Sequence, residues 1–305
     1  MELRSVAYLV TIAEEGSLRA AAQRLGLTQP ALTKAVRRLE DELGARLLTR
    51  TARGVVPTEA GLALLRHGRE VQASLAEAAR EIEALKAGFA GEVRVGAGPA
   101  WQQRILPDAL ARFRAARPQA RILVQAGMDD LLKAELRAGR LDLVLAATPR
   151  GEELEPDLAH RPLTVDDYAV VAAADHPLRG RGALPPAALL EYPWILPGPG
   201  THMVQTLAAL FRGHGLPAPR PVIETDANRL RLALVASGPY LTYNTVLQLA
   251  ELAPRGLAAL DAPALLWQRS AGIITRRAGE PGPAARALIE TIVQVARARG
   301  LALAA

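Results

Sequence analysis

Polar and cationic side chains recur at helical spacing near the N-terminus. The pattern from Gln29-Pro30 to residue 43 predicts a helix that Thr28 can cap. Away from its apolar positions this helix carries Gln29, Thr33, Lys34 and Arg37. A helix that enters the major groove of DNA needs such residues, because Gln pairs with adenine and Lys or Arg with guanine or phosphate. The alternative is that they form the solvated side of an ordinary surface helix.

Two glycine- and proline-containing loops provide a second kind of chemistry. Gly98-Pro99-Ala100-Trp101 and Gly198-Pro199-Gly200-Thr201-His202 each follow a predicted strand and open a helix. Free backbone N–H groups at helix N-termini favour an anion, particularly if both ends face one cleft. Neither loop, taken as residues 96–101 and 198–203, contains Lys or Arg, so we expect neutral donors to bind the anion.

Both loops also have plainer interpretations. Pro99 and Pro199 fit ordinary turn chemistry, whether or not a ligand binds. Trp101 is expected either to pack in the core or to form an apolar wall of the cleft together with Met128 and Met203.

Motifs for catalysis and metal binding are weak. The chain has no cysteine, which excludes disulfides, thiol catalysis and cysteine-bound zinc, and its five histidines lack metal-ligand spacing. Gly96-Ala97-Gly98 lacks the third glycine of a nucleotide loop, and no Ser-His-Asp arrangement stands out. We therefore expect no cofactor and no enzyme activity, with an α/β enzyme as the leading alternative.

Composition gives the broad class. The 305 residues exceed a typical domain, half of them are hydrophobic, and the net charge of +6 modestly favours a polyanionic partner. Residues 1–22 lack the features of a signal peptide, and no apolar stretch approaches the ~20 residues of a membrane span. We expect a cytoplasmic protein that does not enter membranes. A stand-alone solute-binding protein, the other alternative, would lack residues 1–90 and carry a signal peptide.

The helix predicted to begin at Gln29-Pro30 lies within an N-terminal part that consists of two segments. Residues 1–57 predict short helices followed by a basic hairpin that turns at Arg53-Gly54. Residues 58–86 predict one long helix with apolar residues spaced by 4, 3, 4 and 3, namely Val71, Leu75, Ala78, Ile82 and Leu85. An exposed helix with such a seam buries it against another helix, in parallel or antiparallel, and Gly88 and Gly91 mark a linker after it.

Residues 92–305 alternate strands with helices, which predicts a parallel sheet covered by helices. Strand candidates include 92–96, 121–125, 141–146, 168–173, 194–196, 221–225, 240–243 and 272–276. Helices are predicted at 102–116, 130–138, from 201, at 227–236 and from 283. We divide this domain into lobe I, residues 92–162 and 268–305, and lobe II, residues 163–267.

The run SLRAAAQRLGLTQPALTKAVRRLEDELGARLLTRTARGVVPTEAG, residues 17–61, closely resembles the DNA-binding signature of LysR-type transcriptional regulators. The matching features keep their spacing over the whole run, including Gln29-Pro30-Ala31-Leu32, Leu43-Gly44 and Thr58-Glu59-Ala60-Gly61. Beyond residue 92 the resemblance is looser and includes Leu141-Asp142-Leu143, His176-Pro177-Leu178 and Val235-Ala236-Ser237-Gly238.

The resemblance implies a winged helix-turn-helix at 1–57, a dimerising linker helix and hinge at 58–91, and a sensor similar to periplasmic binding proteins at 92–305. It implies that a double-stranded DNA operator is contacted by Thr28, Gln29, Pro30, Thr33, Lys34, Arg37, Arg50 and Arg53. It also implies a homodimer that assembles into a homotetramer, contact with RNA polymerase, and a small-molecule effector between the lobes.

The effector site that the resemblance implies adds Met128, Thr148 and Asn244 to the two loops with Thr201, His202 and Met203. Tyr243-Asn244 stands where the family usually has an apolar residue and proline. The effector's identity therefore cannot be carried over from relatives.

Overall fold

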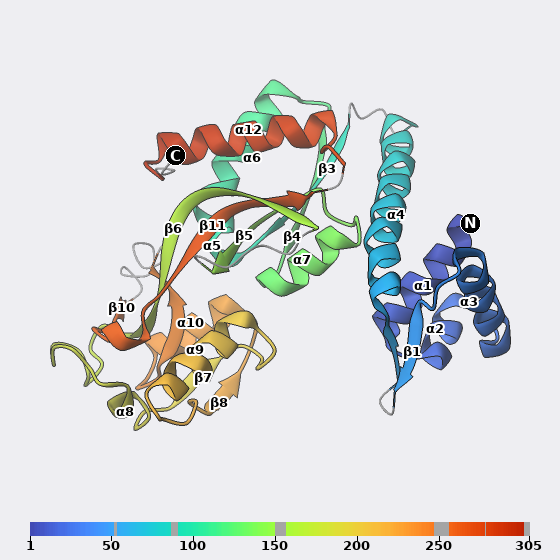
Figure 1. Ribbon diagram of the computed structural model, residues 1–305. Helices are drawn as coiled ribbons and strands as arrows, with labels where there is room; N and C mark the ends of the chain where they lie inside the picture. Colours follow the sequence, from blue (N-terminus) through green and yellow to red (C-terminus); the bar gives the residue numbers. More distant parts are fainter. Residues whose placement is uncertain (52–53, 87–90, 150–156, 247–255, 278, 302–305) are drawn as a thin grey trace.

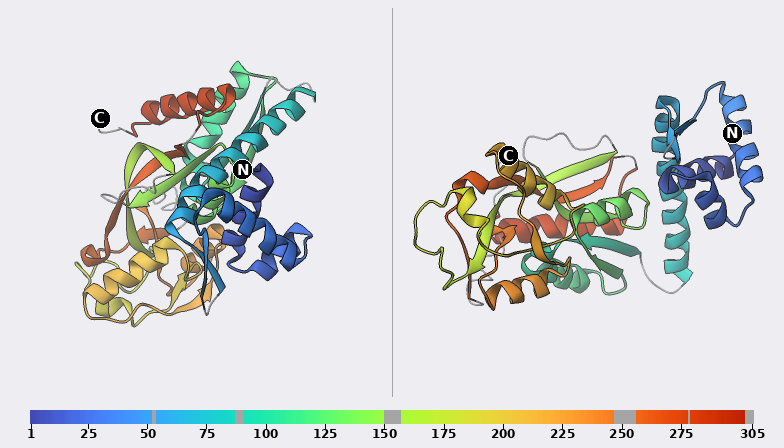
Figure 2. Two further views of the ribbon diagram at one scale, coloured as in Figure 1. Left: turned by 45° about the vertical axis from the view of Figure 1, so that its right-hand side comes forward. Right: turned by 90° about the horizontal axis from the view of Figure 1, so that it is seen from below.

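The computed structural model describes residues 1–51, 54–86, 91–149, 157–246, 256–277 and 279–301. Within these residues an N-terminal domain and a larger C-terminal domain lie on opposite sides of one long helix (Figures 1 and 2). The predicted fold class, a winged helix-turn-helix, a linker helix and a two-lobed α/β domain, is confirmed.

The N-terminal domain consists of three helices and a hairpin. The elements are α1 (Leu3–Glu15), α2 (Leu18–Leu25), α3 (Gln29–Leu43), β1 (Leu48–Thr51) and β2 (Gly54–Pro57). Ser17 and Thr28 cap α2 and α3, because their side chains accept from the backbone N–H groups of Ala20 and Ala31, both at 3.4 Å. Leu9, Leu32 and Leu39 lie in the core, so α3 keeps its polar side for solvent.

Helix α4 (Glu59–Lys86) joins the two domains. The Thr58 hydroxyl accepts from Gly61 N at 3.0 Å and donates to Arg46 O at 2.6 Å, which links the start of α4 to the segment just before β1. Gly68 lies against Val6 of α1, where a Cβ would come within 2.4 Å of a Val6 methyl. The helix therefore leaves the N-terminal domain along a closely packed face.

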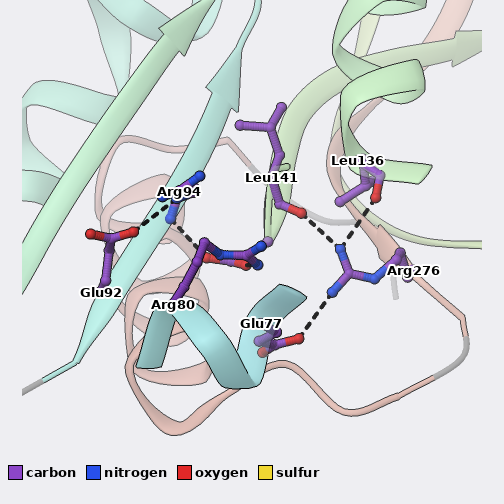
Figure 3. A network of polar contacts seen from close by, with 8 residues as sticks. Glu77, Arg80, Glu92, Arg94, Leu136, Leu141 and Arg276 are labelled. Carbon is purple, nitrogen blue, oxygen red and sulfur yellow. Dashed lines mark hydrogen bonds and ion pairs between the residues drawn. The ribbon is translucent and has the colours of Figure 1, made fainter. Parts of the chain in front are cut away.

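The opposite end of α4 contacts the C-terminal domain through paired charges (Figure 3). Arg276 donates through Nη1 to the backbone oxygens of Leu136 and Leu141 at 3.2 and 2.8 Å, and its Nη2 lies 3.2 Å from Glu77 of α4. Arg80 of α4 lies 3.4 Å from Asp142. Beside them Gly139 has φ +69°, and a Cβ there would come within 2.6 Å of Ala73, so glycine is required on two counts.

Lobe I is a sheet with helices on both faces. Parallel strands β4 (Arg121–Ala126), β3 (Glu92–Ala97) and β5 (Leu143–Pro149) lie side by side in that order. Helices α6 (Leu106–Ala116) and α12 (Pro283–Ala298) pack on one face, and α7 (Asp129–Arg137) packs on the other (Figure 1). Alternate residues of β5 explain this, because Leu143 and Leu145 join the α6 and α12 core while Val144 joins the α7 core.

The single helix predicted over 102–116 is divided into α5 (Pro99–Arg104) and α6, so that prediction is wrong in its continuity. The break lies at Ile105, whose φ is −110°. Pro107 lies in the first turn of α6, where a missing backbone N–H is tolerated. In the interior of one continuous helix the same proline would have removed a hydrogen bond, so α5 ends before it.

Two long antiparallel strands run from lobe I into lobe II. They are β6 (Leu158–Ala173) and β11 (Trp267–Arg276), longer than the segments predicted at 168–173 and 272–276. The extensions contain polar residues, which break the apolar pattern of a strand in the sequence. These residues face each other on the two strands, with Asp167 opposite Gln268 and Asp166 opposite Arg269. The pairing shifts register between Ala271 and Gly272.

Lobe II packs around the far end of this pair. Its elements are α8 (Pro186–Leu189), β7 (Trp194–Leu196), α9 (His202–Gly213), β8 (Pro221–Glu224), α10 (Asn228–Ala236), β9 (Thr242–Thr245), β10 (Leu257–Ala259) and η3 (Pro263–Leu265). Its larger core includes Trp194, Phe211 and Tyr243. Among the described helices, none combines the length and apolar character needed to cross a membrane.

Candidate functional site

The free side of α3 is the first candidate surface. Thr28, Gln29, Pro30, Lys34 and Arg37 are exposed. Thr33 is half-buried, and its hydroxyl donates to Gln29 O at 2.9 Å. Within the described part of the chain, Lys34 and Arg37 form no ion pair, so both cations remain available to a partner. Of the predicted wing residues, Arg53 and the Arg50 side chain lie outside the described residues.

The predicted seam of α4 forms an exposed apolar stripe. Leu75 and Ile82 are each 54% exposed, and Val71 and Ala78 are also exposed. The side chain of Leu85 lies outside the described residues. The stripe is on the side of α4 away from Ala73, Glu77 and Arg80, because the two sets are separated by about half a turn. It is therefore free for another helix while α4 contacts the C-terminal domain.

The second candidate site is a cavity of about 60 Å³ between the two lobes. Most of the predicted effector residues line it, and they come from segments far apart in the sequence: Gly98, Pro99, Ala100, Trp101, Met128, Thr201, His202, Met203 and Asn244. The side chain of Thr148 lies outside the described residues. Trp101 and Met203 are buried and also belong to the cores of lobes I and II, so the packing interpretation of Trp101 holds together with a place in the cavity wall.

A larger cleft of about 920 Å³ continues outward from this inner cavity. The two share Pro99, Met128, Asp130, Thr201 and Asn228, so we call the larger space the mouth. Gln102, Gln103 and Leu131 line the mouth from lobe I, and Arg229 lines it from lobe II. The lobes are bridged beside it by a hydrogen bond that His202 N donates to Asp130 at 3.1 Å.

Arg269 is a paired cation of the inner cavity. Its guanidinium lies 3.3 Å from Asp129 and 3.5 Å from Asp166, and 4.2 Å from the centre of the Tyr168 ring. Burial acts to lower the pKa of Arg269, but Tyr168, Asp129 and Asp166 outweigh it, so the pKa is raised. Burial raises the pKa of Tyr168 as well. This cation is held by protein carboxylates.

Arg231 is a second cation there, and it is 2% exposed. Its Nη2 donates to Asn228 Oδ1 at 2.7 Å, whereas its Nε and Nη1 have no hydrogen-bond partner among the residues that the structure describes. Among the described residues, no carboxylate forms an ion pair with it. Burial therefore lowers the pKa of Arg231, although Tyr168 and Asp226 act in the opposite direction.

These two arginines correct one prediction. The sequence predicted that neutral donors alone would meet an anion, because loops 96–101 and 198–203 contain no Lys or Arg. That prediction is wrong, since Arg231 on α10 and Arg269 on β11 line the cavity from within regular elements, and Lys133 on α7 lines it too.

A signal for Arg231 is present in the sequence. Residues Asn228, Arg231 and Val235 share one face of α10, and all three are buried. A cation on the apolar face of a short helix is costly unless something pairs with it. Loop patterns at strand ends do not indicate Arg231, because this residue lies in the middle of a helix.

The described residues contain no group of three or more His, Cys, Asp or Glu side chains that could hold a metal ion. The side-chain N–H donors and the N-terminal end of α9 allow the inner cavity to bind an anion by charge and hydrogen bonds.

Comparisons with known proteins agree with this arrangement. Residues 3–62 match the family model of the bacterial regulatory helix-turn-helix protein, lysR family, and residues 86–297 match the LysR substrate binding domain. The chain is 34% identical over 295 residues to the HTH-type transcriptional regulator GalR of Pseudomonas putida, covering 96% of this chain and 74% of that protein.

Two further comparisons extend over nearly whole chains. The SDS degradation transcriptional activation protein of a Pseudomonas species is 34% identical and covers 94% of each chain. Among solved structures, full-length OxyR from Pseudomonas aeruginosa is 26% identical with a TM-score of 0.54, covering 97% of this chain and 95% of that one. These relatives are named as regulators of transcription and not as enzymes.

Proposed function

Since the chain belongs to the LysR family of transcriptional regulators, with a DNA-binding domain and an effector-binding domain, we propose that it binds a specific operator. We propose further that a small organic anion bound between its lobes controls this binding. The observation that supports a negatively charged effector is Arg231, a buried guanidinium in the cavity wall that forms no ion pair with a carboxylate of the described residues. A buried charge is stable when it is paired, so an anion is the natural partner for it.

The operator is contacted by α3 and by the wing. On α3, Gln29 and Thr33 read base edges, while Lys34 and Arg37 approach bases or phosphates. Arg50 and Arg53 of the wing approach phosphates or the minor groove. The exposed face of α3, with two cations free of ion pairs in the described part of the chain, supports these roles. A two-fold dimer presents two such helices about one helical turn, ~34 Å, apart, so the operator is partly palindromic.

The dimer forms through the α4 seam of Val71, Leu75, Ala78, Ile82 and Leu85, and two dimers assemble into a tetramer. Support for the pairing comes from the exposed apolar stripe on α4. Replacing Leu75 and Ile82 together by Asp places charges in the seam, where their burial is costly. Sedimentation should then show dissociated chains, whereas Leu62→Asp, on another exposed face of α4, should leave the assembly intact. An unchanged assembly for the seam variant would exclude this interface.

DNA reading is tested by selecting a preferred duplex from a random pool and measuring binding by fluorescence anisotropy. Gln29→Ala should weaken binding to the selected duplex by about 1–3 kcal/mol relative to a scrambled one. Arg53→Ala should weaken both duplexes and reduce the salt slope by about one. Equal loss on both duplexes in the Gln29 variant would contradict its base-reading role.

The anion is tested with the full-length protein and a thermal-shift screen of aromatic, sulfonated and sugar acids. Compounds that bind raise the unfolding midpoint by mass action. Arg231→Met should abolish that rise, whereas Arg212→Met should not, because Arg212 is exposed on α9 outside the cavity and its mouth. Retained response in the Arg231 variant, or binding by neutral or cationic compounds alone, would overturn the proposal.

A further inference from the structure

We infer that the effector is a monocarboxylate with a second hydrogen-bond acceptor next to its carboxylate, a 2-hydroxy or 2-oxo acid. This inference rests on the anion proposed above and adds the chemical class of that anion. Its basis is a set of buried side-chain nitrogens on residues that line the inner cavity and have no hydrogen-bond partner among the described residues. The donors are Arg231 Nε and Nη1, Asn228 Nδ2, Asn244 Nδ2 and Arg269 Nε, and His202 Nε2, which can donate or accept, is also without a partner there.

The orientation of Asn228 follows from its contact with Arg231. Its Oδ1 accepts from Arg231 Nη2 at 2.7 Å, which makes Nδ2 the nitrogen and therefore a donor. Asn228 is also buried, so this donor cannot reach bulk water. The cluster therefore requires acceptors, and the backbone and side chains around it do not supply them.

One carboxylate cannot satisfy this set. The guanidinium is a planar fork, and the edge between Nε and Nη1 is occupied by its own Cδ. A carboxylate that binds two nitrogens must therefore use Nη2 together with either Nε or Nη1, which leaves the other nitrogen free. A carboxylate has about four acceptor sites, and the bidentate contact uses two of them. The two that remain cannot serve that nitrogen, the two Asn Nδ2 groups and Arg269 Nε together, so a further acceptor is needed.

The charges around the cavity indicate that the second acceptor is neutral. The wall contains three cations, Arg231, Arg269 and Lys133, and three carboxylates, Asp129, Asp130 and Asp166. Asp129 and Asp166 both contact Arg269, and among the described residues none of the three carboxylates forms an ion pair with Arg231. A monoanion compensates Arg231, whereas a second carboxylate would meet three carboxylates at close range. A hydroxyl or carbonyl oxygen accepts hydrogen bonds without adding charge.

Size agrees with an acid of this kind. A cavity of about 60 Å³ holds roughly four to six water-sized groups, since one such group needs about 10–15 Å³. That is enough for a carboxylate, its neighbouring carbon and one further oxygen. The rest of the molecule lies in the mouth, whose volume of about 920 Å³ is in the range for an organic ligand.

The test compares four acids that share one body, measured by calorimetry with the full chain. 3-Phenylpropionate has the carboxylate alone, phenyllactate and phenylpyruvate add a 2-hydroxyl and a 2-oxo group, and benzylmalonate adds a second carboxylate. We expect phenyllactate or phenylpyruvate to bind at least about tenfold more tightly than phenylpropionate, because buried donors reject an analogue that lacks their acceptor. Benzylmalonate should bind more weakly than both.

Variants assign the preference to the cavity. Asn244→Leu should reduce the preference for phenyllactate or phenylpyruvate by about threefold or more while phenylpropionate binds as before. Thr242→Val removes a buried hydroxyl from the same strand outside the cavity wall and should leave the preference intact.

The outcomes separate the two proposals. Equal affinity for phenylpropionate and its 2-substituted forms, lost in Arg231→Met, would keep the anion and overturn the second acceptor. Tightest binding by benzylmalonate would overturn the monoanion. Failure of all four acids to bind at millimolar concentration would overturn the anionic effector itself, and the class inferred here with it.

Discussion

Two clusters of buried charge in the C-terminal domain differ in how fully the protein satisfies them. At the α4 contact, Arg276 donates to Leu136 O, Leu141 O and Glu77, and the Asp142 carboxylate accepts from Arg94 N at 2.8 Å and lies near Arg80. In the inner cavity, the described part of the chain gives Arg231 a single acceptor and leaves two of its nitrogens without one. Both clusters contain arginine in a largely dry environment, yet only the first is complete.

The difference indicates what each cluster is for. A satisfied network stabilises one arrangement of α4 against the sensor, whereas an unsatisfied one costs free energy until a ligand completes it. Replacing an arginine should therefore lower the free energy of unfolding in the first cluster and raise it in the second.

The largest effect is expected at the complete cluster. Arg276→Met leaves two backbone oxygens and Glu77 without their donor, and Arg276 is 14% exposed, so we expect a loss of about 2–3 kcal/mol in the free energy of unfolding. All three tryptophans, Trp101, Trp194 and Trp267, lie in the C-terminal domain, so their fluorescence in urea reports its unfolding.

Arg161→Met is the matched control for this prediction. It removes an ion pair with Glu290 whose side chains are 43% and 60% exposed, and such pairs contribute less than about 1 kcal/mol. Equal losses for the Arg276 and Arg161 variants would mean that the α4 contact is no stronger than a surface pair.

At the incomplete cluster, replacing the arginine is expected to raise the free energy of unfolding. Without ligand, Arg231→Met should raise the free energy of unfolding by about 1–2 kcal/mol, because it replaces an unpaired buried cation with an apolar chain of similar length. Thermal unfolding in a buffer free of organic acids measures it. A destabilisation as large as that of the Arg276 variant would show that Arg231 is structural and would remove the contrast between the clusters.

A smaller effect is expected at His160 on β6, whose Nε2 is also without a hydrogen-bond partner in the described ranges of the chain. Burial, aided by Lys133, lowers its pKa from 6.5 to about 4. His160 therefore becomes protonated below about pH 6.5 in the unfolded chain, but only below about pH 4 in the folded chain. Stability falls as the pH falls through this window and levels off below it.

The size of this effect is about 1 kcal/mol, after allowing for a ring that is partly exposed. His160→Gln removes the titration, so the difference between the pH profiles of the wild-type protein and the variant isolates it from the carboxylates. Parallel profiles between pH 6.5 and 4 would contradict the lowered pKa.

Much of the fold follows from short-range signals in the sequence. Thr28 and Pro30 mark the start of α3, and the apolar seam marks α4, because caps and helical periodicity depend on neighbours in the chain. The two loops at 98–101 and 198–203 were also expected to face one cleft, and most of their residues do line one cavity.

The charges of that cavity could not be predicted in the same way. Arg269 and Asp166 lie opposite each other on β11 and β6, about a hundred residues apart in the chain, and their meeting depends on the register of two strands that the sequence had underestimated. Asn228 and Arg231 look like polar members of an ordinary helix until the placement of α10 buries them. Burial of this kind is a tertiary property, which periodicity alone does not reveal.

The pair of long strands, β6 and β11, has a mechanical consequence. Since both run unbroken from one lobe to the other, relative motion of the lobes must bend or twist this two-stranded ribbon. Two-stranded ribbons twist more strongly than wider sheets. The register shift lies between Ala271 and Gly272, and Gly272 lies so close to the partner strand that a Cβ would come within 2.2 Å of Arg161 O. A side chain added at residue 272 would therefore push the two strands apart and change the angle between the lobes.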